Sequence, residues 1–181
     1  MENVKPMQFR TDYNVEFRGP HLISTNSAVN SATSIARLYN DEKNDLTSSS
    51  TASGATTLVA DNPSLFQVGD ILIITLDDQT LHSCGAITEI SLSQSTIKFT
   101  TALASIASIG ARLGVQLGAN ISMLLYGSPV VKQYNWGFRG IIPYNHVGLR
   151  IGQIIRIEID FTTSAGAKAL SIIRTSIIGG S

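Results

Sequence analysis

Alternation of apolar and charged side chains in the segment GQIIRIEIDF, residues 152–161, constrains the fold of this chain more than any other feature. The apolar residues fall on one side of an extended backbone: Ile155, Ile157, Ile159 and Phe161. Because successive side chains of a strand point to opposite faces, this pattern predicts a half-buried strand. Gly166 lies at the centre of the turn that follows, and KALSIIRTSII, residues 168–178, is predicted to return antiparallel.

A series of shorter β-rich segments precedes this hairpin. They are separated by Gly, Asp-Asp or Ser-Gln-Ser and include TTLVA, GDILIITL, TLHSCGAITEI, STIKFTTA and GARLGVQL. Their number and spacing predict a small SH3-like or related β-barrel over residues 58–118. Residues 119–181 are predicted to form further antiparallel strands that pack with the rest of a mainly β fold.

The first 57 residues are less regular. Residues 1–46 are predicted to form an extended N-terminal arm, with a loosely alternating strand and at most one short helix. The helix prediction rests on one apolar stripe in SAVNSATSIARLY: Val29, Ala32, Ala36 and Tyr39. Residues 47–57, TSSSTASGATT, have the composition of a flexible linker.

The composition indicates a chain that packs against neighbours. Hydrophobic residues make up 43% of the 181 residues and charged residues only 14%, compared with roughly 25% in typical soluble domains. The formal net charge is +0, from 13 Lys+Arg and 13 Asp+Glu, and the basic residues are scattered. Since duplex binding needs several cations on one face, we expect no direct nucleic-acid binding. A weakly charged surface favours association between subunits.

Neither the cysteine content nor the hydropathy suggests a metal cluster or a membrane span. One cysteine is present, which excludes an internal disulfide framework and a cysteine-based zinc site. No apolar run approaches the roughly 18 residues that a spanning helix needs, so we expect no membrane association. The N-terminal segment MENVKPMQFR lacks the apolar core of a signal peptide, and we expect synthesis in a cytoplasm.

The densest group of chemically active residues lies between two apolar strands: Asp77, Asp78, His82 and Cys84. Asp-Asp-Gln-Thr occupies the place of a hairpin turn, where Asp tolerates the geometry and bonds to its own backbone. Adjacent carboxylates in an exposed turn do not face each other across a substrate. His82 and Cys84 lie on one face of a strand, but no orienting Asn or Asp accompanies them. The segment is therefore interpreted as a hairpin.

The other histidines and the glycines match no catalytic pattern. His21 and His146 both lie in turn surroundings, outside any H-x-x-x-H or H-E-x-x-H arrangement. The chain contains no G-x-S-x-G elbow and no Walker or dinucleotide-binding glycine pattern. We therefore expect a non-enzymatic protein without catalytic, metal-binding or cofactor-binding residues and without a cofactor.

An aromatic-rich segment, SPVVKQYNWGFRGIIPYNH at residues 128–146, is predicted to be a long contact loop. Its candidate interaction residues are Trp136, Tyr134, Phe138 and Tyr144. Aromatic side chains are enriched in both cores and interfaces, which favours packing on a sheet or on another subunit. Binding of a sugar or stacking of a base is the alternative.

Residues Phe66 to Leu113 resemble a small β-barrel module that recurs in virion proteins of tailed bacteriophages. The resemblance rests on FQVGDILIITLDDQTLHSCGAITEI, TIKFTTAL and GARL. Gln79 stands where the family pattern has a turn glycine. The resemblance implies a non-enzymatic structural protein located in the virion and assembled in the host cytoplasm.

These observations lead to one main hypothesis and two alternatives. The main hypothesis is a virion structural protein, either a capsid decoration (cement) subunit or a head-tail connector or tail component. It would form a homo-oligomer, a trimer or a ring, and contact other virion proteins such as capsid, neck or tail subunits. The first alternative is a carbohydrate-binding β module that uses Trp136 and Tyr134, and an enzyme of unknown class is the second.

Overall fold

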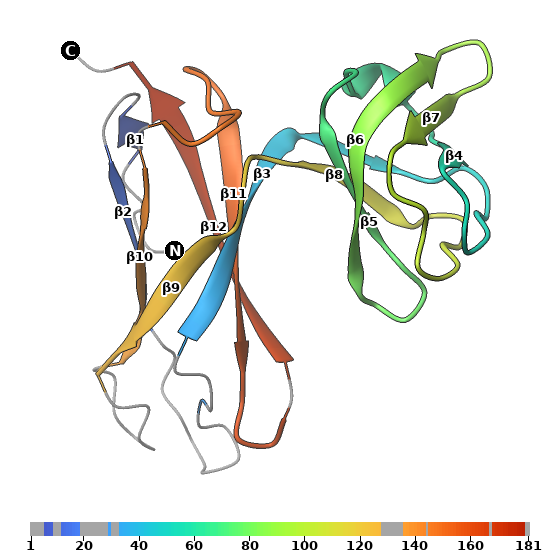
Figure 1. The fold of residues 1–181 in the computed structure, drawn as a ribbon. Coiled ribbons are helices and arrows are strands. Elements are labelled where there is room, and N and C mark those ends of the chain that lie inside the picture. The colour runs from blue at the N-terminus through green and yellow to red at the C-terminus, as the bar shows by residue number, and fades with distance from the viewer. Residues whose placement is uncertain are drawn as a thin grey trace. The chain divides into compact units, whose positions relative to one another are not determined.

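The computed structural model describes residues 6–8, 12–18, 29, 33–127, 136–143, 145–166 and 168–179 (Figure 1). The fold is mainly β, as predicted from the sequence. The chain divides into two compact units. Unit 1 comprises Met1–Leu38 and Leu117–Ser181, and unit 2 comprises Tyr39–Gln116. Within the described residues, no helix has the length and apolar character needed to cross a membrane.

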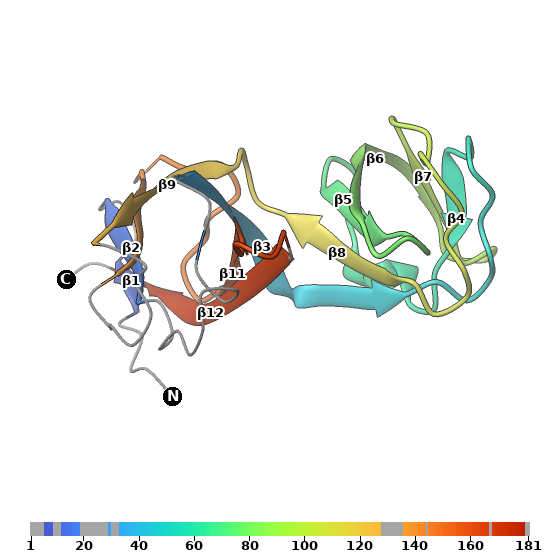
Figure 2. The ribbon, with the colours of Figure 1, turned by 90° about the horizontal axis from the view of Figure 1, so that it is seen from below.

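Unit 1 is a single curled sheet with the strand order β1-β12-β11-β3-β9-β10-β2. Its strands are β1 (Met7–Gln8), β2 (Tyr13–Arg18), the first part of β3 (Thr33–Leu46), β9 (Ile121–Tyr126), β10 (Gly137–Ile142), β11 (Ile154–Thr162) and β12 (Lys168–Ile178). β1 pairs parallel to β12, whereas β2, β9 and β10 pair antiparallel. The sheet curls until β1 and β2 lie side by side, as both views show (Figures 1 and 2).

The β11–β12 hairpin confirms the prediction from the alternating pattern. Its register runs without interruption from Ile154 opposite Ser176 to Thr162 opposite Lys168. The alternate isoleucines of β11 are fully buried, and Phe161 packs against them. Gly166 has φ +78°, a left-handed conformation that glycine adopts at little cost in a tight turn.

The core of unit 1 lies inside the curled sheet. Its largest fully buried side chains include Trp136, Phe138, Leu38, Met123 and Ile142. Trp136 makes edge-on ring contacts with Phe138 at 6.3 Å and with Phe161 at 6.2 Å between ring centroids. Such aromatic contacts add to the burial of apolar area that stabilises a core.

Unit 2 is a small antiparallel barrel with the strand order β3-β8-β5-β6-β7-β4. Its elements are the second part of β3, β4 (Thr57–Val59), a short 3-10 helix η2 (Pro63–Leu65), β5 (Ile71–Thr75), β6 (Leu81–Ser91), β7 (Thr96–Phe99) and β8 (Arg112–Gln116). The barrel closes where the end of β4 meets the end of β3. Ser48 N donates to Val59 O at 3.0 Å, and Asp61 N donates to Leu46 O at 2.9 Å.

The helix predicted for residues 27–39 is wrong in its described part, because β3 begins at Thr33. Ile35 is exposed, whereas Ala36 and Leu38 are fully buried, which follows the period of a strand rather than that of a helix. β3 pairs with β9 from Thr33 opposite Leu124 to Ala36 opposite Ile121. Strand pairing on both sides outweighs the weak helix propensity of Ser and Thr.

The predicted boundaries of arm, linker and barrel also need correction. The described part of the arm belongs to the two units, because β2 pairs with β10 and β3 contributes to both units. Residues 47–57, predicted to be a flexible linker, pack within unit 2. Thr47 and Thr51 are buried and form bridges to Ala60 and Ala107. Small Ser and Thr side chains suit this place because they bond to nearby backbone groups, as Thr47 Oγ1 does to Ser108 O at 2.8 Å.

Candidate functional site

The Asp77–Asp78 segment is the turn of the β5–β6 hairpin, as predicted. Asp77 accepts hydrogen bonds from Ser108 N and Ser108 Oγ, both at 2.8 Å. Asp78 accepts from Thr80 N at 2.9 Å and from Thr80 Oγ1 at 2.6 Å. Gln79 adopts φ +62°, a left-handed conformation that glycine adopts more easily than residues with a side chain. Both carboxylates therefore hold the turn together.

His82 and Cys84 lie on β6, and their environment does not suit a nucleophilic pair. Cys84 is fully buried, and this burial raises the pKa of its thiol from 9.0 to about 12. The thiolate, which is the reactive form, is therefore absent near neutral pH. His82 is half-buried opposite Ile74, and its Nε2 has no hydrogen-bond partner among the described residues. The two side chains help to fill the barrel.

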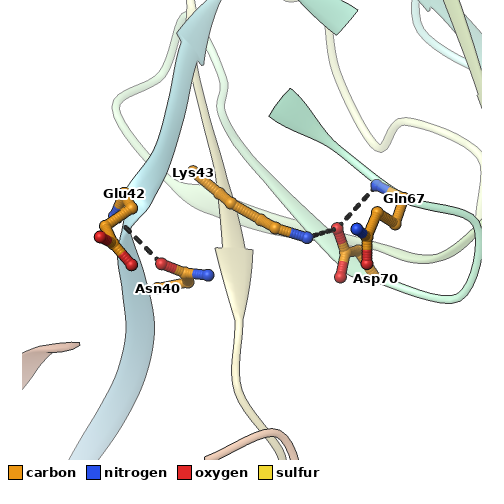
Figure 3. Close-up of polar contacts among 5 residues, drawn as sticks. All are labelled: Asn40, Glu42, Lys43, Gln67 and Asp70. Atoms are coloured by element: carbon orange, nitrogen blue, oxygen red, sulfur yellow. Dashed lines mark hydrogen bonds and ion pairs between the residues drawn. The ribbon is translucent and has the colours of Figure 1, made fainter. Parts of the chain in front are cut away.

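The polar contacts around Lys43 form a second candidate (Figure 3). β3 has a bulge between Asn40 and Asn44, where the register against β8 shifts. Lys43 Nζ reaches from this bulge to Asp70 Oδ2 at 2.6 Å, and both side chains are about four-fifths buried. Asp70 Oδ2 also accepts from Gln67 N at 2.9 Å. The ion pair therefore ties the bulge of β3 to the turn that precedes β5.

His146 has a structural role as well. Its Nε2 lies 2.9 Å from Leu117 O, at the start of the segment that leads into β9. Gly118 has φ +59°, and a Cβ atom there would lie 2.7 Å from His146 Nε2. The imidazole therefore packs on a turn that only glycine allows. His21 lies outside the described residues.

The prediction of an aromatic contact loop over residues 128–146 is wrong for the part of this segment that the structure describes. Gly137–Ile142 is strand β10, and Trp136 and Phe138 are both 0% exposed in the core of unit 1. A buried Trp136 cannot serve as a stacking platform for a sugar or as a surface contact residue. Tyr134 and Tyr144 lie outside the described residues. Interspersed Gly and Pro in the sequence are typical of a loop, whereas pairing with β2 and β9 makes Gly137–Ile142 a strand.

A groove of about 730 Å³ lies on the outer face of β2, β9 and β10 in unit 1. The exposed side chains that line it include Asn14, Glu16, Ser122, Leu124, Arg139 and Ile141. Leu124 and Ile141 are 58% and 55% exposed. Glu16 and Arg139 are direct cross-strand neighbours. Beside them, Tyr126 Oη donates to Glu16 Oε1 at 2.6 Å, and the Arg139 guanidinium lies 6.0 Å from the Tyr126 ring centroid.

Sequence reasoning missed these outward apolar positions, although adjacent apolar residues mark them. In each of several Leu/Ile doublets of unit 1, one residue faces the core and the other faces outward. The doublets are Leu124–Leu125, Ile141–Ile142, Ile154–Ile155, Ile172–Ile173 and Ile177–Ile178. A strand with one solvated face should alternate apolar and polar residues, so doublets indicate apolar positions on both faces.

Within the described ranges, no three His, Cys, Asp or Glu side chains are grouped so that they could hold a metal ion. Comparisons of the chain with models of protein families, with curated proteins and with solved structures gave no match.

Proposed function

We propose that this chain is a structural protein of a tailed-bacteriophage virion, without enzymatic activity, that works by assembling with copies of itself and with other virion proteins. The proposal covers three positions in the virion: the capsid surface, the neck and the tail. At these positions the chain would be a decoration, head-tail connector or tail subunit. Supporting it are the resemblance of residues Phe66–Leu113 to a virion barrel module and the character of the molecular surface.

The outer apolar face of unit 1 carries the proposal. The large apolar side chains exposed on its strands are Ile35, Leu124, Ile141, Ile154, Ile172 and Ile178. Exposed apolar side chains that gather on sheet faces are a common property of surfaces that bind other proteins. With only 14% charged residues in the chain, few charges oppose such contacts.

A second supporting feature is that unit 2 also presents apolar side chains to solvent. Ile106 and Ile109 are exposed in the segment before β8, and Leu92 is exposed in the turn between β6 and β7. A subunit of a ring or lattice must bind at least two neighbours through different surfaces. Apolar positions on both units provide separate surfaces for this purpose.

Purified particles of the phage that encodes the chain provide the test. Quantitative mass spectrometry should find the protein in multiple copies per particle, and deletion of its gene should yield particles that lack a component or fail to mature. Analytical ultracentrifugation of the purified protein should show a homo-oligomer such as a trimer or ring. A protein that is absent from particles and remains monomeric would contradict the proposal.

A further inference from the structure

The groove on β2, β9 and β10 brings two opposite charges together with exposed apolar side chains. Glu16 and Arg139 stand on adjacent strands, and both side chains are exposed. Within the subunit, Glu16 Oε1 also lies 2.6 Å from Tyr126 Oη and 3.8 Å from Arg18 Nε.

This arrangement is complementary to itself. A two-fold axis that lies between two facing copies, midway between Glu16 and Arg139, places each carboxylate opposite the guanidinium of the other copy. The same rotation places the exposed Ile141 of each copy opposite Asn14 of the other, because these two residues are cross-strand partners on β10 and β2. An interface of this kind uses the same patch on both subunits and needs complementary charges at symmetric positions.

The residue types agree with a protein interface. Tyr126 and Arg139 are in ring contact at the groove, and Tyr and Arg are enriched at the energetic centres of interfaces. Ile141 supplies apolar area, and Asn14 supplies a neutral polar group beside it. A second sheet can pack face to face on this surface at the usual spacing of about 10 Å.

We propose that the outer face of β2, β9 and β10 binds the same face of a second copy of this chain, with Glu16 of each copy opposite Arg139 of the other. The inference rests on the proposed self-assembly and adds a two-fold contact to it, since such a contact pairs subunits and a trimer or ring is closed by a different, heterologous contact.

Charge reversal in the full-length protein tests the proposed contact by sedimentation velocity. Glu16→Arg gives a face with two positive charges, and Arg139→Glu gives a face with two negative charges. Each variant alone should dimerise with a Kd on the order of 100-fold higher than the wild type. An equimolar mixture of the two variants should restore dimers, because opposite charges then face each other across the interface.

The mixture distinguishes a contact between subunits from a change inside one subunit. Each variant still carries its own like-charge pair in the mixture, so only attraction between the two different variants can restore dimers. A matched control is the cross-strand pair of Glu89 and Lys98 in unit 2, joined at 2.8 Å and largely exposed. Glu89→Arg and Lys98→Glu should leave the Kd unchanged. Ile141→Ser, at an exposed position, should raise the Kd about 10-fold without loss of folding. This variant provides the test if either charge reversal unfolds the protein.

Three results would overturn the inference: a wild type that is monomeric at about 100 μM, charge reversals without effect, or a mixture that stays monomeric. If the wild type is oligomeric and the groove variants leave its Kd unchanged, the proposed self-assembly stands and its contacts lie elsewhere on the subunit. A groove-dependent dimer that is absent from virions would instead contradict the proposed virion role alone.

Discussion

Asp77 and Asp78 are adjacent in one turn but accept hydrogen bonds from different residues. Asp78 closes its own turn through Thr80, whereas Asp77 bonds to Ser108, which lies far along the chain in the segment before β8. Cys84, a few residues further on, is buried among apolar side chains of unit 2. Residues that formed one candidate site in the sequence thus have separate structural roles, and each role depends on the residue's immediate surroundings.

The buried Cys84 thiol should make the protein less stable at alkaline pH. Its pKa is about 12 in the folded chain and near 9.0 when exposed, so between these values the unfolded state binds fewer protons. Stability therefore falls as pH rises through this window. From pH 8 to pH 10, the unfolding free energy of the wild type should fall by about 1.4 kcal/mol more than that of Cys84→Ala.

Urea unfolding of both proteins under reducing conditions, at the two pH values, measures this difference. Tyrosines and lysines titrate in both proteins, so their contributions cancel in the comparison. A constant gap between wild type and variant across the range would show that the thiol is not held neutral by burial.

At the scale of elements, β3 is the strand on which the architecture depends. Its first part pairs with β9 in unit 1, and its second part pairs with β8 and closes the barrel of unit 2. Asn40 and Asn44 stabilise the bulge within the pairing with β8: Asn40 Oδ1 accepts from Glu42 N at 3.0 Å, and Asn44 Nδ2 donates to Asp41 O at 2.6 Å. Lys43 then anchors the bulge to Asp70 (Figure 3).

Removing one member of the Lys43–Asp70 pair should destabilise unit 2, because the other charge is left mostly buried. Lys43→Met and Asp70→Asn should each cost about 1–2 kcal/mol, and the double variant should cost less than their sum. Chemical denaturation of the four proteins gives the coupling energy, which we expect to be about 1 kcal/mol.

The exposed Glu89–Lys98 pair is the matched control for this cycle, with side chains 62% and 54% exposed. The corresponding cycle of Glu89→Gln and Lys98→Met should give a coupling energy below about 0.5 kcal/mol. Equal coupling in the two pairs would mean that the burial of Lys43 and Asp70 adds nothing to their interaction.

At the scale of the whole molecule, unit 2 is an insertion in unit 1 between the first part of β3 and β9. The chain leaves unit 1 after Leu38 and returns at Leu117, and Leu117 N donates to Leu38 O at 2.7 Å. Each unit has its own cluster of buried apolar side chains. Closely spaced insertion points and separate cores are the features that let an inserted domain fold by itself.

Residues 39–116 should therefore fold as an isolated fragment, and unit 1 should fold when Leu38 is joined to Leu117 by an Asn-Gly turn. Circular dichroism and cooperative thermal unfolding test both products. A fragment of residues 58–118 is the control. It lacks the part of β3 that closes the barrel and should remain unfolded. Folding of this shorter fragment would show that closure by β3 is dispensable.

Local patterns in the sequence were enough to predict the mainly β fold, the β11–β12 hairpin and the turn at Asp77–Asp78. In these cases the partner strand is the next one along the chain, so alternation and turn residues identify the pairing. The doublet Ile141–Ile142 likewise carries local information about an apolar outer face.

Only the tertiary structure decided that residues 33–46 form a strand and that Trp136 is buried. Residues 33–46 have weak propensities of their own, and they are a strand because β9 and β8, distant in the sequence, supply their hydrogen bonds. Trp136 is buried because β2 and β9 pair with β10 and turn this segment toward the core. Alternation shows that a strand has an inner face, but the partners that enclose this face come from distant segments, and no local pattern specifies them.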